Sequence, residues 1–270
     1  MEIIKNYNLD TFILDENGMI FDNFVKSNFN MEEHGINLKY YHTLRVAKMS
    51  KEVGKKVGLD ENLCYLLGLL HDYARFYQWA EFKSFLDRKT FDHADRACHL
   101  LFEDGKIADF KVDKKDYLML NMAIKFHNKF AIDEQYIKDQ FSKDADNTNS
   151  FETIINYCNL IRDTDKLDLF NLIGFGGLSI MFEKDGYTTS CLESLKAHQL
   201  VKIEQMQTKL DRIFCFLAFL FDLNFKASLA EINLENYFSA LREHYAVKLN
   251  EEDKNFLNEV ILEVKAALKA

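Results

Sequence analysis

Six side chains with metal-binding chemistry lie on, or at the ends of, segments with a helical pattern. Four are imidazoles and two are carboxylates: His42, His71, His93, His127, Asp72 and Asp165. Imidazole nitrogen and carboxylate oxygen together suit first-row divalent metal ions. Helical bundles build such sites from side chains that project inward from facing helices. We therefore predict that these six residues meet at one metal site.

The surroundings of the donors favour this interpretation. The run LCYLLGLLHDYAR places His71 and Asp72 at the end of a strongly apolar helix. A carboxylate there needs a partner, because burial of an unpaired charge is unfavourable, and a metal ion supplies one. A single histidine on an apolar face is usually an ordinary core residue, and an isolated HD pair is uninformative. Four such histidines with HD and a later aspartate are harder to explain in that way.

The elements that must position these donors are predicted to be helices. Apolar residues recur at helical spacing from Leu38, and Gly58 is expected to end that helix. Asp60 is expected to cap the next helix, which runs directly into His71. Residues 1–35 have a mixed, loop-like pattern. Later helices are predicted from 90–92 to before Gly105, from Asp113 past His127, over 151–168, and as about three more in the last 80 residues, the final one capped by Asn250.

The composition fits a helical globular protein and excludes several classes. The chain has 270 residues, of which 48% are hydrophobic and 29% charged, and it contains no proline. Proline breaks helices, so its absence suits an all-α fold. The formal net charge of −9 lacks the basic footprint of a nucleic-acid-binding protein. No segment has the length of uninterrupted apolar sequence that a membrane-spanning helix needs.

Cysteine usage points to the cytoplasm. The five cysteines are odd in number and show no CxxC spacing, so they are interpreted as reduced core residues of a cytoplasmic protein. The N-terminal sequence lacks the pattern of a secretory signal. We predict one all-α bundle, or an α core with an α extension, and the sequence leaves open whether it forms a homo-oligomer.

The order of the donors resembles a known family. The pattern His42, then His71–Asp72 after a leucine-rich helix, then Asp165 in IRDTDKLD is similar to that of the HD superfamily of metal-dependent phosphohydrolases. The resemblance covers roughly residues 38 to 170. It implies an HD-domain helical bundle that binds a divalent metal through these four positions and hydrolyses phosphate esters, mostly of nucleotides or related compounds.

Two further histidines extend the resemblance. His93 in DHADRACHLL and His127 in AIKFHNKF look like the extra ligands of two-metal branches, in particular of bacterial diadenosine tetraphosphate hydrolases. The GYP motif of cyclic-dinucleotide phosphodiesterases is missing. On this basis the chain divides into an N-terminal segment packing on the core (1–37), an HD metal-binding core (38–180) and a C-terminal helical extension (181–270).

The predicted mechanism is hydrolysis by a metal-activated water. One or two divalent ions lower the pKa of bound water and orient the phosphate ester. Asp72 is the natural bridge between two ions, with His93 and His127 serving the second. With a single ion, these two histidines would instead contact phosphate and shuttle protons. Arg45 and Arg75 lie one helical turn from a ligand and are the favoured cations for the substrate phosphate.

Several questions stay open at the level of sequence. The ion can be Mn, Fe, Ni, Co or Mg, since all tolerate such mixed ligands. The expected partner is a small phosphorylated substrate of the nucleotide class, with neither nucleic acid nor membrane as a partner. The alternative function is a catalytically silent HD module that binds metal and nucleotide for regulation. A purely structural helical protein with coincidental histidines is the third reading.

Overall fold

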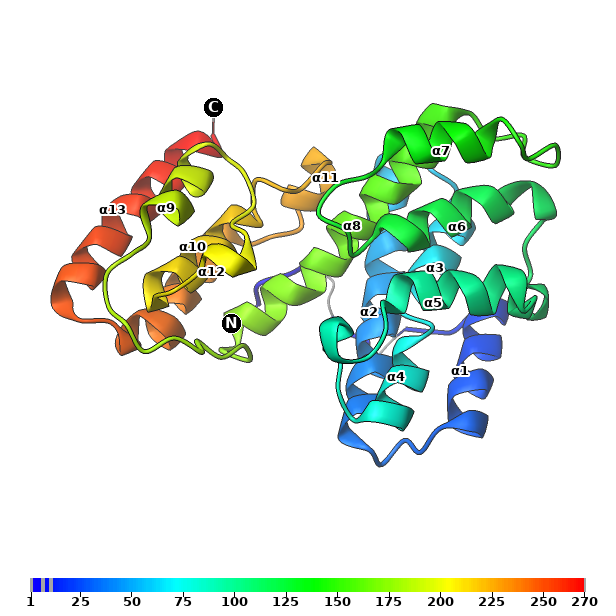
Figure 1. Ribbon diagram of the computed structural model, residues 1–270, viewed down its shortest axis with the longest axis horizontal. Coiled ribbons are helices and arrows are strands. Elements are labelled where there is room, and N and C mark those ends of the chain that lie inside the picture. The colour runs from blue at the N-terminus through cyan, green and yellow to red at the C-terminus, as the bar shows by residue number, and fades with distance from the viewer. Residues whose placement is uncertain (1, 6–7, 10–11, 270) are drawn as a thin grey trace. The chain divides into compact units, whose positions relative to one another are not determined.

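The fold is all-α, as predicted. The computed structural model describes residues 2–5, 8–9 and 12–269, and helices account for most of them (Figure 1). Within these ranges the β pairing amounts to two isolated bridges, Ile4 with Ile232 and Lys184 with Thr208. None of the described helices is both long and apolar enough to cross a membrane.

The chain forms two compact units. One comprises residues 6–165, and the other combines residues 1–5 with 166–270. The boundary lies inside the long helix α8 (Phe151–Gly174), which continues beyond the residue 168 expected from sequence. The division at residues 37 and 180 stays a prediction.

The unit of residues 6–165 contains the helices that carry the six donors (Figure 1). Short 3₁₀ turns and a π-helical turn, His99–Glu103, lie between them. The helices, with the first part of α8, are α1 (Glu16–Asn28), α2 (His34–Lys56), α3 (Glu61–Leu70), α4 (Arg75–Phe82), α5 (His93–Cys98), α6 (Tyr117–Phe126) and α7 (Glu134–Phe141).

Helix α1 shows that the loop-like interpretation of residues 1–35 was wrong. The Asp15 carboxylate caps the helix by accepting a hydrogen bond from the Gly18 amide at 2.8 Å. Phe21 and Val25 are fully buried on its inner face. This helix forms although its apolar residues are few, because packing of its short buried face against the rest of the unit stabilises it more than its own sequence does.

Helices α2 and α3 pack closely, and this packing sets the position of two donors. The Asp60 carboxylate caps α3 as predicted, accepting from the amides of Asn62 and Leu63 at 2.9 Å each. Gly68 faces Ala47 of α2 so closely that an added Cβ atom would lie 2.4 Å from the Ala47 Cα atom. Glycine at this position therefore allows the two backbones to approach.

The second unit is also helical. Its Asn250 caps the last helix as predicted, accepting from the Asp253 amide at 2.8 Å. Chain residues 3–5 join this unit, where the Ile3 carbonyl accepts from the Asn233 amide at 2.8 Å. It contains more helices than the three expected, namely α9 (Thr189–Lys196), α10 (Lys209–Ala218), α11 (Lys226–Leu229), α12 (Leu234–Ala240) and α13 (Glu251–Ala267).

Candidate metal centre

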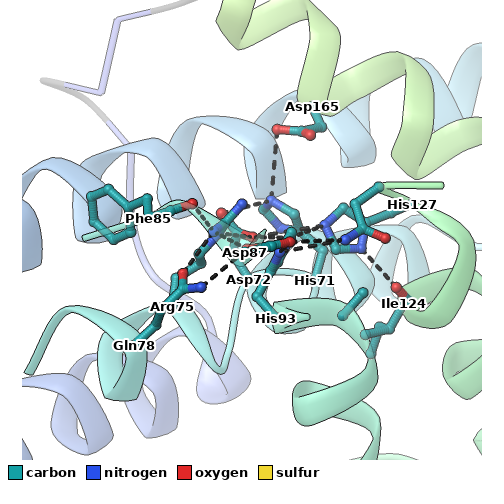
Figure 2. Close-up of polar contacts among 12 residues, drawn as sticks. His71, Asp72, Arg75, Gln78, Phe85, Asp87, His93, Ile124, His127 and Asp165 are labelled. Atoms are coloured by element: carbon teal, nitrogen blue, oxygen red, sulfur yellow. Dashed lines mark hydrogen bonds and ion pairs between the residues drawn. The ribbon is translucent and has the colours of Figure 1, made fainter. Parts of the chain in front are cut away.

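The structure brings all six predicted donors together in the unit of residues 6–165. Figure 2 labels His71, Asp72, His93, His127 and Asp165. Asp72 lies at their centre, in the turn between α3 and α4. Asp72 and the four histidines are buried, whereas the Asp165 side chain is 37% exposed and marks the open edge of the cluster. The histidines come from α2, from the ends of α3 and α6, and from the start of α5.

One half of the centre is formed by His42, His71 and Asp165 around one oxygen of Asp72. The Nε2 atoms of His42 and His71 are 3.3 Å apart. Asp72 Oδ2 lies 3.3 Å from the first and 3.6 Å from the second. Asp165 Oδ1 lies 3.3 Å from His42 Nε2 and 3.8 Å from His71 Nε2. We call these residues, with Asp72 Oδ2, the first half of the centre.

The other half is formed by His93 and His127 around the other oxygen of Asp72. Their Nε2 atoms are 3.0 Å apart, and Asp72 Oδ1 lies 3.3 Å from the first and 3.7 Å from the second. We call this the second half. The two oxygens of one carboxylate thus face two separate histidine pairs, which is the arrangement of a carboxylate that can bridge two ions.

Hydrogen bonds at the far side of three rings fix which nitrogen faces inward. His71 Nδ1 donates to the Gly68 carbonyl at 2.7 Å, and His127 Nδ1 donates to the Ile124 carbonyl at 2.6 Å. His93 Nδ1 lies 2.7 Å from Asp87 Oδ2. Carbonyl and carboxylate oxygens accept only, so each Nδ1 carries the proton. In the neutral ring, Nε2 then presents its lone pair to the centre.

The geometry of the second half shows whether its two histidines fit a metal ion. Two nitrogen lone pairs that face each other at close range repel unless a cation lies between them. Burial lowers the pKa of His93 to about 4, so that this ring is neutral near pH 7. The Nδ1 hydrogen bonds of His93 and His127 turn their Nε2 atoms toward each other, at a separation of 3.0 Å. Nitrogens at ~2.1 Å from one ion at a right angle are themselves ~3 Å apart, so the pair fits a metal ion.

The protonation states suit ligation in the first half as well. Burial lowers the pKa of His71 to about 4. Burial alone would raise the pKa of Asp72, but the Lys39 ammonium and the adjacent imidazoles hold it well below its ordinary value. Neutral imidazole and ionised carboxylate are the forms that bind metal, so His71 and Asp72 are in their binding forms at neutral pH.

The first half is positioned mainly by helix packing. The close approach of Gly68 to Ala47 sets α3, which ends at His71, against α2, which carries His42. The hydroxyls of Ser50 and Thr164 are 2.8 Å apart in the buried core and connect α2 to α8. Asp165, the residue after Thr164, is thereby held opposite His42.

The second half is positioned by a network of polar side chains that the sequence did not reveal. Asp87, in the 3₁₀ turn Asp87–Lys89, holds His93. Its other oxygen accepts from Arg75 Nη1 at 2.8 Å and from Gln78 Nε2 at 3.0 Å. Arg162 donates to the carbonyls of Phe126 and Phe130, on either side of His127, at 3.0 and 3.3 Å.

The two arginines predicted to bind phosphate lie near the donors in different ways. Arg75 Nη1 is hydrogen-bonded to Gln78, Asp87 and the Phe85 carbonyl, and Arg75 Nε lies 3.6 Å from Asp72 Oδ1 (Figure 2). Arg45 is half-buried on α2, one turn after His42. Lys39 was not among the predicted phosphate-binding cations, but its Nζ atom lies 2.6 Å from Asp72 Oδ2, closer than Arg75 Nε lies to Asp72 Oδ1.

Comparison with known protein families supports the resemblance of this part of the chain to HD proteins. The family model described as the HD domain matches residues 40–168. This segment is therefore similar to an HD domain. HD domains are generally metal-dependent phosphohydrolases, and the match includes all six donors of the centre. Searches of curated proteins and of solved structures gave no significant match.

Proposed function

We propose that this HD domain is a metal-dependent phosphohydrolase that hydrolyses a phosphate ester or anhydride of a nucleotide or small phosphorylated metabolite. One observation carries the proposal: the two oxygens of buried Asp72 face two separate histidine pairs at 3.3–3.7 Å. A purely structural core has no use for four imidazoles whose Nε2 atoms converge on one carboxylate.

The donor set favours two divalent ions. His42, His71, Asp72 and Asp165 would hold the first, and Asp72, His93 and His127 would hold the second. Divalent ions at such a site lower the pKa of coordinated water and polarise a phosphoryl oxygen. The runner-up is a single ion in the first half, with His93 and His127 reserved for the substrate phosphate.

The chain itself contributes orientation and partial exclusion of water. The Nδ1 hydrogen bonds of His71, His93 and His127 hold each ring so that Nε2 points inward. The buried side of the centre excludes water, and the exposed side of Asp165 leaves an edge for substrate. We propose that the phosphate approaches from this edge.

Substrate and location are proposed on coarser grounds. The proposal that the substrate is a nucleotide rests on the resemblance to HD phosphohydrolases. The comparisons do not support diadenosine tetraphosphate as the particular substrate. A cytoplasmic location accords with five free, buried cysteines. A catalytically silent regulatory HD module would bind metal and nucleotide with the same residues.

One experiment tests this function. Elemental analysis of the purified protein is combined with a hydrolysis screen of nucleotides and phosphate esters on the same sample, before and after chelation and Mn²⁺ addition. We expect bound metal and hydrolysis that is lost on chelation and restored by Mn²⁺. Bound metal without hydrolysis of any substrate would favour the regulatory module, and absence of metal would contradict the metal centre.

A further inference from the structure

Lys39 holds a special position among the cations of the centre. It lies on α2 three residues before His42, hence on the same helix face. Its Nζ atom is 2.6 Å from Asp72 Oδ2 and 5.6 Å from the centre of the Phe85 ring. Its side chain is 16% exposed, compared with 3% for Asp72. The Lys39 side chain is thus partly exposed, while its ammonium contacts the buried carboxylate of Asp72.

The oxygen that Lys39 contacts is the oxygen that serves the first half. Asp72 Oδ2 also lies 3.3 Å from His42 Nε2 and 3.6 Å from His71 Nε2. An ion held by these three atoms would therefore lie beside the Lys39 ammonium. Like charges at such a distance repel strongly where water is largely excluded, so the ion and the ammonium compete for Oδ2.

Lys39 can move away, whereas the other nearby cation is held. Arg75 makes hydrogen bonds to Gln78, Asp87 and the Phe85 carbonyl, and leaving would break all three. Within the described part of the chain, the polar partner of Lys39 is Asp72, and its long unbranched side chain is 16% exposed. A lysine is a flexible point charge with three donors, which suits a phosphate oxygen.

We propose that Lys39 is the phosphate-binding cation of this centre and that ion binding releases it from Asp72. In the metal-free protein, Lys39 neutralises the bridging carboxylate. When the first ion occupies Asp72 Oδ2, the ammonium turns to the exposed edge and binds the substrate phosphate. This inference rests on the proposed phosphohydrolase function and adds a residue that couples metal loading to recognition of a phosphate-bearing substrate.

The test compares Lys39→Met, Lys39→Arg and Lys55→Met by titration calorimetry, first with Mn²⁺ and then with inorganic phosphate on the Mn²⁺-loaded protein. Lys55 is the matched control, since it lies on the same helix, is 66% exposed and pairs with Glu61 at 3.3 Å. Lys39→Arg keeps the charge, and circular dichroism of each variant verifies the fold.

For Lys39→Met we expect Mn²⁺ affinity to rise several-fold and phosphate affinity to fall about tenfold or more, equivalent to the loss of ~1.4 kcal/mol. Lys39→Arg should keep most of the phosphate affinity, and Lys55→Met should match wild type in both titrations. Added Mn²⁺ should raise the unfolding temperature of Lys39→Met more than that of wild type, because the ion replaces the missing partner of Asp72.

Two other outcomes are distinguishable. Weaker Mn²⁺ binding by Lys39→Met with unchanged phosphate affinity would show that Lys39 only supports Asp72, and it would overturn the proposal while leaving the phosphohydrolase function intact. Failure of the wild-type protein itself to bind Mn²⁺ would overturn the proposed function and this inference with it.

Discussion

The two halves of the metal centre are built by different means. His42 and His71 are brought together by the packing of α2 against α3, with Gly68 facing Ala47. His93 and His127 lie at helix ends and are held by hydrogen bonds to Asp87 and the Ile124 carbonyl. Apolar packing tolerates little change in volume, whereas a polar network can lose one member and still leave the fold intact. The two halves should therefore fail in different ways.

The largest effect is expected from the residue that both halves share. Asp72→Ala removes the carboxylate that faces both histidine pairs, so we expect loss of both ions and of hydrolysis, with the helical fold retained. Bound metal and circular dichroism measure these directly. Retention of the full metal content by this variant would show that Asp72 is not a ligand.

Acid should weaken both halves alike in the metal-free protein. Burial lowers the pKa of His71 and of His93 from the ordinary 6.5 to about 4. Between these values the unfolded chain binds more protons than the folded chain, so stability falls as the pH decreases from about 6.5 to about 4. Each imidazole should contribute roughly 1.4 kcal/mol per pH unit in this window.

Urea unfolding of chelator-treated protein at pH 7 and pH 5.5 measures this dependence. Replacing His71 or His93 by Asn should reduce the slope, because each replacement removes one buried imidazole. Equal unfolding free energies for wild type at the two pH values would contradict the burial of neutral imidazoles.

A change in packing should damage the first half in particular. In Gly68→Ala the new methyl group meets the Ala47 backbone, since its Cβ atom would lie 2.4 Å from Ala47 Cα and 2.8 Å from Ala47 N. Overpacking of this kind costs about 1–3 kcal/mol, and it moves His71 away from His42. Gly105→Ala cannot serve as the control for Gly68→Ala, because Gly105 has a positive φ of 76°, at which any added side chain is itself strained.

Denaturant unfolding and Mn²⁺ titration report the two consequences of Gly68→Ala. We expect lower stability together with a larger loss of affinity at the first ion site than at the second. Unchanged stability would mean that the helices separate without strain and that the crossing does not set the geometry.

A change in hydrogen bonding should damage the second half alone, and this is the smallest effect. Asp87→Asn keeps the size of the side chain but removes the charge that orients His93. Loss of such an outer partner typically weakens metal binding about 10- to 100-fold. Mn²⁺ titration should show the loss at one site only, with Lys89→Ala, two residues along the same turn and exposed, as control. Equal weakening of both sites would contradict the division into halves.

The donor residues could be predicted from the sequence, whereas the polar residues that position the second half could not. The four imidazoles and Asp72 carry their own chemistry and lie on, or at the ends of, segments with a helical pattern, so their convergence on one centre could be anticipated. Asp87 could not be found in this way, because it lies in a short irregular turn and its role depends on a tertiary contact with His93. Lys39 did carry a signal, its spacing of one helical turn from His42, which also applied to Arg45.

The predicted helix boundaries were correct where a capping side chain defines the helix start. They were wrong where tertiary packing determines where the helix begins or ends. Asp60 and Asn250 cap their helices as expected, since each cap is a local hydrogen bond. Helix α6 was expected to continue past His127 but ends at Phe126, where the ring of His127 turns back to the Ile124 carbonyl. Helix α1 was missed because its burial depends on residues distant in the chain.

The central claim is that Asp72 joins two ion sites, and counting ions tests it most directly. Mn²⁺ bound per chain is measured for wild type, His93→Ala and His127→Ala at saturating metal. The account predicts two ions in wild type and one in each variant, with the remaining ion in the first half. One ion in all three proteins, with hydrolysis lost only in the variants, would contradict it and assign His93 and His127 to the substrate phosphate.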